Sequence, residues 1–288
     1  MQIIESIPEL AKRKVDGHKG DYGKVLIVGG SLGMSGAAAL AGLSALRAGA
    51  GLVRVAVVKS VLPIVASIEP CYTTIALPED SDGFISSKAV NVILDVADEN
   101  DVVAFGPGAG QAAGVKKALE ALLAVQGLKL IIDADGLNCL CKIIGWGERA
   151  KAEIVLTPHP GEMVRLWKSV FREDLPTDRT EQAQRLAEAT RAVVVLKGAG
   201  TVVSDGEKIY VNKTGNPGMA TAGAGDVLTG VIAALIGQGL SSFDAAVLGV
   251  YTHGRAGDIA AKKVGQISII ATDIADGISQ AFMHHSVD

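Results

Sequence analysis

The sequence predicts an α/β fold built on a mostly parallel central sheet. Short apolar runs alternate with helical patterns along the first half of the chain, as in strands joined by crossover helices. These runs are almost continuously apolar, which is typical of strands buried on both faces. The 288 residues include 35 glycines and only 4% aromatic residues. Small side chains must therefore fill much of the contact between helices and sheet.

The first half of the chain predicts five buried strands with helices between them. The strands are expected at residues 24–30, 52–58, 101–105, 129–132 and 153–156. The helices are expected at roughly 35–48, 86–97, 111–125 and 136–143. In an open parallel sheet, ligands bind beyond the carboxyl ends of the strands. The loops that follow these strands should therefore carry the function.

After residue 190 the pattern changes to closely spaced strands followed by helices. Strands are expected at 192–196, 200–204 and 207–211, and Ser204-Asp205-Gly206 is a typical hairpin turn. Helices near 224–237, 242–262 and 271–284 complete the pattern. No repeat, low-complexity tract or obvious linker appears, and the polar stretch 173–180 reads as a surface loop. We expect a single domain over residues 1–288.

Composition excludes several classes of function. The formal net charge is −4 with acids and bases mixed, which does not indicate a nucleic-acid surface. Two uncharged runs, 25–46 and 227–243, are interrupted or too short for a membrane span, and the N-terminal residues lack a signal-peptide core. Cys71, Cys139 and Cys141 fit neither a disulfide framework nor a zinc site. We expect all three to be small buried hydrophobes in a reducing cytoplasm, and we do not expect the terminal histidines 284 and 285 to be a ligand pair.

The most informative stretch runs from Asn216 to Asp226, NPGMATAGAGD. Small residues lead directly into an apolar helical pattern, and a helix start presents unpaired N–H groups that attract anions. A carboxylate at that place repels phosphate, so Asp226 is better suited to take a proton or to help hold a metal ion. An anion cradle with a carboxylate suggests phosphoryl transfer. A glycine-rich turn with an Asp near a helix N-terminus is the alternative.

Three further loops at predicted strand ends carry polar groups. In the loop that ends at Glu162, His159 could donate a hydrogen bond to a ligand, and Glu162 could hold Mg²⁺ through water. The alternative there is a rigid turn with a first-turn Glu. In the second loop, Asp133-Ala-Asp135-Gly-Leu-Asn138, two carboxylates and the amide of Asn138 converge. The alternative is that one Asp only caps the next helix. The third loop, Lys197-Gly-Ala-Gly-Thr201, could line a nucleotide phosphate or ribose, or be a plain turn.

Several further features either allow two interpretations or do not match a known signature. The charged segment from His18 to Lys24 could clamp an anionic substrate or be a solvated turn. His253 fits a packed helix residue better than a ligand. Residues 17–24 do not form a Walker A loop, because Val25 stands where Ser or Thr is required, and residues 106–111 lack the third glycine of a dinucleotide fingerprint.

Taken together and in order, these stretches resemble the ADP/ATP-dependent NAD(P)H-hydrate dehydratases of the ribokinase-like superfamily. The matching segments lie between residues 18 and 258: HKGDYGKVLIVGGS, GAAALAGLSALRAGAGLV, FGPGAG, IDADGLN, LTPHPGEM, VVLKGAGTVV, NPGMATAGAGDVLTG and VYTHGRAGD. The resemblance implies a three-layer α/β/α fold with a central, mostly parallel sheet of about eight strands. The superfamily's metal-associated Asn-x-x-Glu appears here as His159-Pro-Gly-Glu162, which puts the first position in question.

The resemblance also assigns site residues. It implies substrate contacts at Ala37, Gly108, His159 and Asp226. It implies nucleotide binding at Lys197, Gly198, Ala199, Gly200, Thr201 and Gly225. On chemical grounds we assign Asp226 as the catalytic base. The helix start is assigned as the phosphate cradle: Gly223, Ala224 and Gly225. A Mg²⁺ ion would bridge the nucleotide phosphates, with Glu162 as a water-mediated ligand.

The implied reaction is the ADP-dependent dehydration of the S-form of hydrated NADH or NADPH, which releases AMP and phosphate. ATP is the donor in eukaryotic members. Relatives tend to be tetramers, and an N-terminal epimerase domain is common among bacterial ones. We therefore expect a cytoplasmic homotetramer whose functional partner is a separate NAD(P)H-hydrate epimerase. Two rivals are a kinase of a small vitamin precursor such as hydroxyethylthiazole and a nucleotide sensor without turnover; the intact Asp226 argues against the sensor.

Overall fold

The computed structural model describes residues 2–283 and contains one ten-stranded sheet. Only β9 runs antiparallel to its neighbours; every other pairing is parallel. The order across the sheet is β1-β10-β9-β8-β7-β6-β5-β2-β3-β4. The strands are β1 (Gln2–Ile3), β2 (Lys24–Val28), β3 (Leu52–Val58), β4 (Thr73–Leu77), β5 (Val102–Phe105), β6 (Lys129–Ile132), β7 (Glu153–Leu156), β8 (Val193–Leu196), β9 (Val202–Ser204) and β10 (Lys208–Val211).

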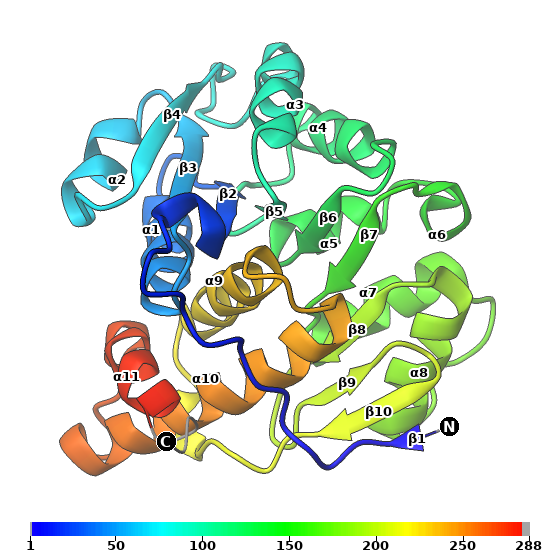
Figure 1. Cartoon of the computed structure of the whole chain (residues 1–288). Helices are drawn as coiled ribbons and strands as arrows, with labels where there is room; N and C mark the ends of the chain where they lie inside the picture. Colours follow the sequence, from blue (N-terminus) through cyan, green and yellow to red (C-terminus); the bar gives the residue numbers. More distant parts are fainter. Residues whose placement is uncertain (1, 284–288) are drawn as a thin grey trace.

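Helices cover both faces of this sheet and make three layers (Figure 1). One face carries α1, α9 and α10, with α11 packed outside them, and the other carries α3, α4, α5, α7 and α8. The α-helices are α1 (Ser35–Arg47), α2 (Leu62–Ile68), α3 (Val90–Asp98), α4 (Ala113–Leu123), α5 (Asp135–Leu140), α6 (Trp146–Arg149), α7 (Pro160–Val170), α8 (Arg179–Thr190), α9 (Ala224–Gly237), α10 (Ser242–Val264) and α11 (Ala271–Met283). Three short 3₁₀ helices are η1 (Lys19–Tyr22), η2 (Ser87–Ala89) and η3 (Pro217–Met219).

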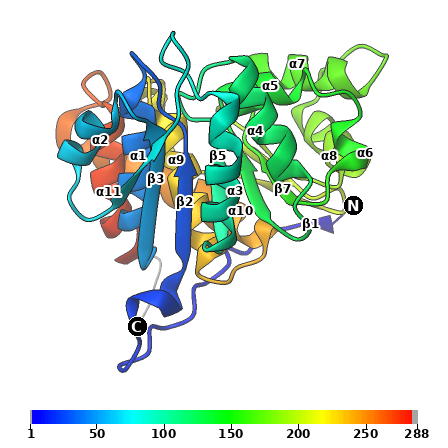
Figure 2. The same cartoon turned by 90° about the horizontal axis from the view of Figure 1, so that it is seen from above.

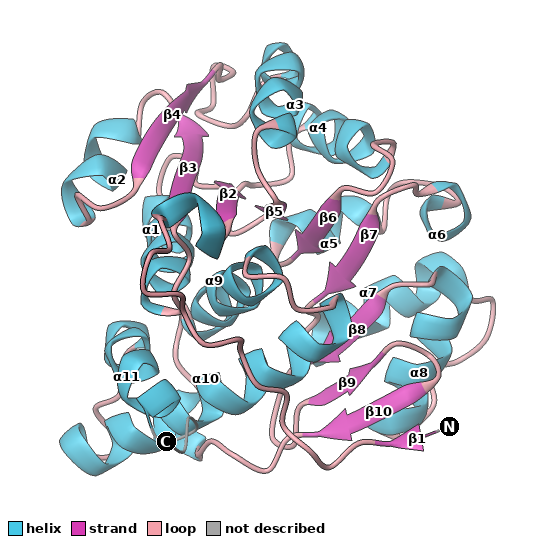
Figure 3. Cartoon of the chain, in the orientation of Figure 1, coloured by secondary structure: helices cyan, strands magenta, loops and turns pink. Residues whose placement is uncertain are grey.

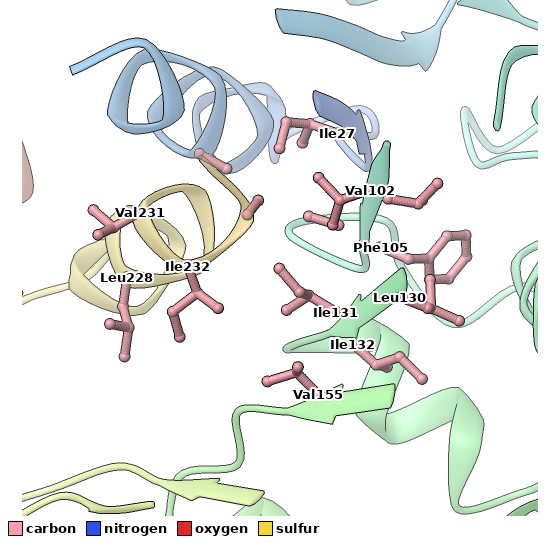
Figure 4. Close-up of a cluster of buried hydrophobic side chains, with 14 of the residues drawn as sticks. Ile27, Val102, Phe105, Leu130, Ile131, Ile132, Val155, Leu228, Val231 and Ile232 are labelled. Carbon is pink, nitrogen blue, oxygen red and sulfur yellow. The ribbon is translucent and has the colours of Figure 1, made fainter. Parts of the chain in front are cut away.

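The core lies on both sides of the central strands. On β6, Ile131 points toward α9 while Leu130 and Ile132 point to the opposite face, as the alternation of a strand requires (Figure 4). Helix α9 is buried from residue 227 to residue 236, because it lies between the sheet and the helices α1 and α10. A helix that is apolar on nearly all sides is expected in such a place. The apolar sequence of α9 is therefore explained by its central position.

All eight strands expected from the sequence are present, and the structure adds β1 and β4. Strand β1 has only two residues, which is too short to leave a pattern. Strand β4 forms the edge of the sheet, and its residues are mostly exposed or half-buried. Helices α2, α6 and α8 were also missed, and in α8 half of the residues are Arg, Glu or Gln. The expected helix 271–284 is present from Ala271 to Met283. The histidine pair 284–285 lies outside the described residues.

The strand arrangement places the candidate loops at one edge. The carboxyl ends of β5, β6, β7 and β8 lie side by side, so the loops that follow them are neighbours (Figure 3). The segment from His18 to Gly23 precedes β2 and lies at the opposite end of the molecule from the starts of α5 and α7 (Figure 2). The sequence alternative of a solvated turn fits that position better than a clamp on the substrate of this chain.

The cysteines differ in their exposure. All three cysteines are free thiols; Cys139 is buried and Cys141 is half-buried, but Cys71 is exposed. The expectation that all three are buried is therefore wrong for Cys71, which follows α2 in a turn before the edge strand β4. Within residues 2–283, no helix is both long enough and apolar enough to cross a membrane.

Candidate active site

The start of α9 is the first component of the site. Gly223 is the N-cap with φ of 88°, and the helix begins at Ala224. Asp226 is therefore the third residue of the first turn, where backbone N–H groups lack partners within the helix. From α10, the Nε2 atom of His253 donates a hydrogen bond to the Ala224 carbonyl oxygen over 2.9 Å. Burial lowers the pKa of His253 to about 4, so this packed side chain is neutral.

A buried ion network joins the candidate loops. The Lys197 Nζ atom, after β8, lies 2.6 Å from Asp133 Oδ1, after β6, and 3.9 Å from Glu162 Oε2 on α7. The second oxygen of Asp133 accepts a 2.7 Å hydrogen bond from the Thr229 hydroxyl on α9. Asp133 is 1% exposed, so its charge depends on these partners. Although burial lowers the pKa of Lys197, Asp133 and Glu162 raise it above its ordinary value, and the ammonium stays charged.

Asp226 lies beside this network and is strongly perturbed. Burial and, to a lesser degree, the negative charge of Asp133 raise its pKa to about 7, although Lys197 opposes the shift. A carboxyl group with a pKa near neutrality can accept a proton with useful driving force and still be ionised at cellular pH. The environment therefore suits Asp226 to act as a general base.

His159 and Glu162 form a reciprocal cap at the start of α7. The Nδ1 atom of His159 accepts the N–H of Gly161 over 2.9 Å, and Glu162 Oε2 accepts the N–H of His159 over 2.7 Å. Burial lowers the pKa of His159, and the charges of Lys197 and Arg165 lower it further. The imidazole is thus neutral with its proton on Nε2, which leaves that nitrogen as a donor. The cap fixes the orientation of the ring, with Nε2 3.5 Å from Glu162 Oε1, and a ligand role for Nε2 stays a prediction.

An open cavity of about 540 Å³ lies at this edge of the sheet. Five of the assigned residues line it: Ala37, Gly108, Glu162, Gly223 and Asp226. Gly108 approaches α1 so closely that a Cβ atom there would lie 2.6 Å from the Met34 carbonyl oxygen and 3.0 Å from the Ala37 Cβ. Only glycine fits, so its backbone borders the cavity directly.

The remaining assigned residues are not in the lining of this cavity. A Cβ atom on Gly225 would lie 3.2 Å from Lys197 Nζ and 3.9 Å from Asp133 Oδ2, which places the helix start against the ion network. Gly198, Ala199 and Gly200 are exposed in the turn that follows Lys197. The structure thus brings the start of α9, the loop of His159 and the Lys197 turn together. It leaves the segment from His18 to Lys24 apart.

The fit of the site to Mg²⁺ follows from its donors. No group of three or more His, Cys, Asp or Glu side chains within the described residues could hold a metal ion by itself. Asp135, Glu162 and Asp226 nevertheless line the same cavity, and carboxylate oxygens are ligands that Mg²⁺ prefers. One oxygen of Glu162 already accepts the His159 N–H, and the Lys197 ammonium is near. A contact through water, with phosphates as the other ligands, fits Glu162 better than direct ligation.

Sequence reasoning assigned no role to Thr229 and left Asp133 undecided. Thr229 is the only polar side chain between Val227 and Ile236 in the buried part of α9, and it lies one turn after Asp226 on the same face. A lone hydroxyl in an apolar helix is a signal that could have identified it. The pairing of Asp133 with Lys197 joins residues 64 positions apart, which no local pattern records.

A second cavity, of about 480 Å³, lies at the amino ends of β7 and β8 and contains none of the assigned residues. It is lined by Gln126, Ala150, Lys151, Ala152, Glu153, Ile154, Thr190, Arg191, Val193 and Ser242. Two cations and one acid border it, without an organised set of donors. The cavity with Asp226 therefore remains the candidate active site.

Comparison with known proteins agrees with this geometry. A family model described as NAD(P)H-hydrate dehydratase matches residues 25–280. A curated relative from Moorella thermoacetica, named bifunctional NAD(P)H-hydrate repair enzyme, is 46% identical over 270 residues, which is 93% of this chain and 51% of the relative. The chain thus spans about half the length of that relative.

Two solved structures extend the comparison. An ADP/ATP-dependent NAD(P)H-hydrate dehydratase from Bacillus subtilis, co-crystallised with ATP and Mg²⁺, superposes with a TM-score of 0.80 at 30% identity. It covers 96% of this chain and 94% of its own. A ribokinase-like superfamily protein from Enterococcus faecalis superposes with a TM-score of 0.82 at 25% identity, covering 96% and 92%. The three-layer fold is therefore ribokinase-like, as the sequence predicted.

Proposed function

This chain belongs to the NAD(P)H-hydrate dehydratase family, and we propose that it removes water from hydrated NADH and NADPH in a nucleotide-driven reaction. The substrate is the S-form of the hydrate, in which water has added across the C5–C6 bond of the nicotinamide ring. ADP is the proposed donor and AMP and phosphate are the products. The co-crystallisation of the Bacillus subtilis protein with ATP and Mg²⁺ supports a nucleotide as cosubstrate.

The observation that carries this proposal is the position of Asp226. Its carboxyl group has a pKa raised to about 7 by burial, and it lines the cavity within the first turn of α9. A base and a set of backbone donors for an anion thus meet at one place. A hydroxyl group that enters this cavity could lose its proton to Asp226 while its oxygen attacks a phosphoryl group held at the helix start.

The chemistry proceeds in two steps. First, Asp226 takes the proton of the C6 hydroxyl, the oxygen bonds to the β-phosphorus of ADP, and the bond to AMP breaks. Second, the ring nitrogen pushes out phosphate as the C6–O bond breaks, and loss of a C5 proton restores the double bond. The sum converts hydrate and ADP into NAD(P)H, AMP and phosphate. Hydroxide is a poor leaving group, which is why phosphorylation must come first.

The other residues have supporting roles in this proposal. His159 donates from Nε2 to the hydrate, whose contacts also include Ala37 and Gly108. The turn from Lys197 to Thr201 and the N–H of Gly225 hold the nucleotide. A Mg²⁺ ion bound by the phosphates, with a water held by Glu162, would supply charge neutralisation.

We also propose the setting in which the chain works. A cytoplasmic homotetramer is proposed, in line with the tendency of the family. Its functional partner is an NAD(P)H-hydrate epimerase, which converts the R-form of the hydrate into the S-form that this site uses.

One assay tests the proposal. Purified protein is incubated with hydrated NADH and Mg²⁺, with ADP or ATP, and both phosphate release and the absorbance of the reduced nicotinamide ring are followed. We expect both signals to rise together and faster with ADP. A stable phosphorylated product with no return of absorbance would indicate a small-molecule kinase. Tight nucleotide binding with no phosphate release would indicate a sensor.

A further inference from the structure

One arginine holds the turn between β8 and β9. Arg179, the first residue of α8, donates from its guanidinium to four backbone carbonyl oxygens of this turn. Its Nη2 atom lies 2.9 Å from the oxygen of Leu196 and 3.0 Å from that of Lys197. Its Nη1 atom donates to Ala199 and lies 3.4 Å from the oxygen of Gly200. The planar guanidinium fork can serve several acceptors at once, which a single ammonium cannot.

The other carbonyl groups of the turn are also occupied. The Thr201 hydroxyl donates to the Gly198 oxygen over 2.9 Å, and the N–H of Asn212 donates to the Thr201 oxygen over 2.9 Å. Together with the four bonds from Arg179, every carbonyl oxygen from residue 196 to residue 201 accepts a hydrogen bond from within the protein. No carbonyl oxygen of residues 196–201 is therefore left without a donor.

Most N–H groups of the same turn have no hydrogen-bond acceptor within the described residues. Lys197 donates its N–H to the Pro158 oxygen over 2.8 Å, but the N–H groups of residues 198–201 donate to no acceptor in the part of the chain described. Residues 198–200 are exposed, and Gly198 has a φ of 135° that only glycine adopts readily. Free N–H groups in succession form a concave donor surface for anions.

The charge of Arg179 is unusual for its position. No carboxylate within residues 2–283 forms an ion pair with it, and its Nε atom is buried without a partner. Arg185, on the same helix, instead pairs with Glu173 and Glu181. The positive charge of Arg179 is thus offset only by carbonyl dipoles, which favours an anion at the turn.

We propose that Arg179 is a positioning residue for the nucleotide. By taking the carbonyl oxygens of the turn, its guanidinium fixes the N–H groups of residues 198–201 toward the nucleotide phosphates or ribose. This inference rests on the proposed nucleotide site and adds to it a residue that does not touch the ligand. It requires the guanidinium geometry and not only a positive charge.

The test removes the guanidinium and then supplies it again. In Arg179→Ala, we expect the dissociation constant for ADP, measured by titration calorimetry, to rise by about tenfold or more, because several charge-assisted hydrogen bonds are lost. The KM for ADP should rise with it, while the KM for the hydrate should change little. Millimolar guanidinium chloride should restore ADP affinity in a saturable way, whereas urea or sodium chloride should not. Arg179→Lys should recover only part of the loss.

Arg185→Ala is the matched control on the same helix. It removes a guanidinium and two ion pairs, so it can change stability, but its ADP affinity should be unchanged and insensitive to guanidinium. Folding of each variant is checked by circular dichroism. If Arg179→Ala does not fold, Arg179→Lys decides: wild-type ADP affinity in that variant overturns the inference.

The outcomes separate this inference from the proposed function. A wild-type protein that neither binds ADP nor releases phosphate with the hydrate contradicts the function itself. A wild-type protein that does both, together with a folded Arg179→Ala that binds ADP normally, contradicts only the role of Arg179. Lost affinity without guanidinium rescue in a folded variant also overturns it.

Discussion

Two regions of the site present free backbone N–H groups, and they obtain them in different ways. At the start of α9, the N–H groups of Gly225 and Asp226 are free within residues 2–283 because a helix has no partners for its first turn, while the N–H of Ala224 donates to the Thr221 oxygen over 3.4 Å. In the turn after β8, the N–H groups of residues 198–201 are free in the described part of the chain, and Arg179, Thr201 and Asn212 hold the turn by donating to its carbonyl oxygens. The first surface follows from local sequence. The second depends on a side chain about twenty positions away.

The two regions also differ in the charge that accompanies them. The helix start carries Asp226, a carboxyl group whose pKa is raised by burial, and the turn carries the cations Lys197 and Arg179. With a base beside one donor surface and cations beside the other, the helix start would carry out the chemistry and the turn would bind the nucleotide. Variants at the helix start should therefore reduce turnover, and variants at the turn should reduce nucleotide affinity.

The largest expected effect comes from Asp226→Asn, which tests the chemical half of this division. The amide cannot accept the hydroxyl proton, so turnover should fall by about 10²–10⁴-fold. ADP affinity should be retained, because the backbone donors remain. Phosphate release with the hydrate and calorimetry with ADP measure the two quantities. Asp244→Asn is the matched control, since Asp244 lies in the first turn of α10 away from the cavity. Near-normal turnover in Asp226→Asn would remove Asp226 from its role.

The next effect concerns the ion network that joins the two regions. Asp133→Ala leaves the Lys197 ammonium without its 2.6 Å partner and the Thr229 hydroxyl without its acceptor. We expect the free energy of unfolding to fall by about 3 kcal/mol, because a partly buried charge loses its pair. Urea denaturation measures it. Glu120→Ala, which breaks an exposed pair with Lys116, should change stability by less than about 0.5 kcal/mol. Equal effects of the two variants would mean that the network contributes no more than a surface pair.

A smaller effect appears as a pH dependence. Since burial raises the pKa of Asp226 to about 7, the carboxyl group is protonated below that pH and cannot act as a base. The value of kcat/KM should therefore fall about tenfold per unit as pH decreases below 7, and level off above it. Phosphate release across this range provides the profile. The residual rate of Asp226→Asn should lack this inflection; an inflection that persists in the variant would belong to another group.

The difference between the two regions also explains what the sequence could predict. The buried strand around Ile131 could be predicted from its run of apolar residues. The start of α9 at Ala224 could be predicted from the small residues that lead into an apolar helical pattern. The exposed edge strand β4 and the polar helix α8 have weak patterns, so they were missed. The Asp133–Lys197 pair depends on the order of strands in the sheet, which periodicity does not encode. Arg179 lies in such a polar helix and looks like a surface residue.

The smallest expected effect lies at Ala134, between Asp133 and the start of α5. Its φ of 48° and ψ of −118° are strained for a residue with a side chain. Hydrogen bonds hold this turn: the Asp133 oxygen accepts the N–H of Gly136 over 2.9 Å, and Asp135 Oδ2 accepts the N–H of Gly110 over 2.9 Å. The strained backbone sends one carboxylate toward Lys197 and the other toward the loop after β5.

Ala134→Gly should relieve this strain and keep the geometry. Strain of about 1–3 kcal/mol is removed, and the greater freedom of glycine in the unfolded chain offsets about 0.4–1 kcal/mol of it, so we expect a net gain near 1 kcal/mol. Denaturant unfolding measures the gain. Arg191→Gly is the matched control, since Arg191 has a φ of 57° in the ordinary left-handed region and should gain less. Turnover should be unchanged, because the hydrogen bonds hold the turn. A stabilised but inactive Ala134→Gly would show instead that the side chain of Ala134, which lines the cavity, contacts the substrate.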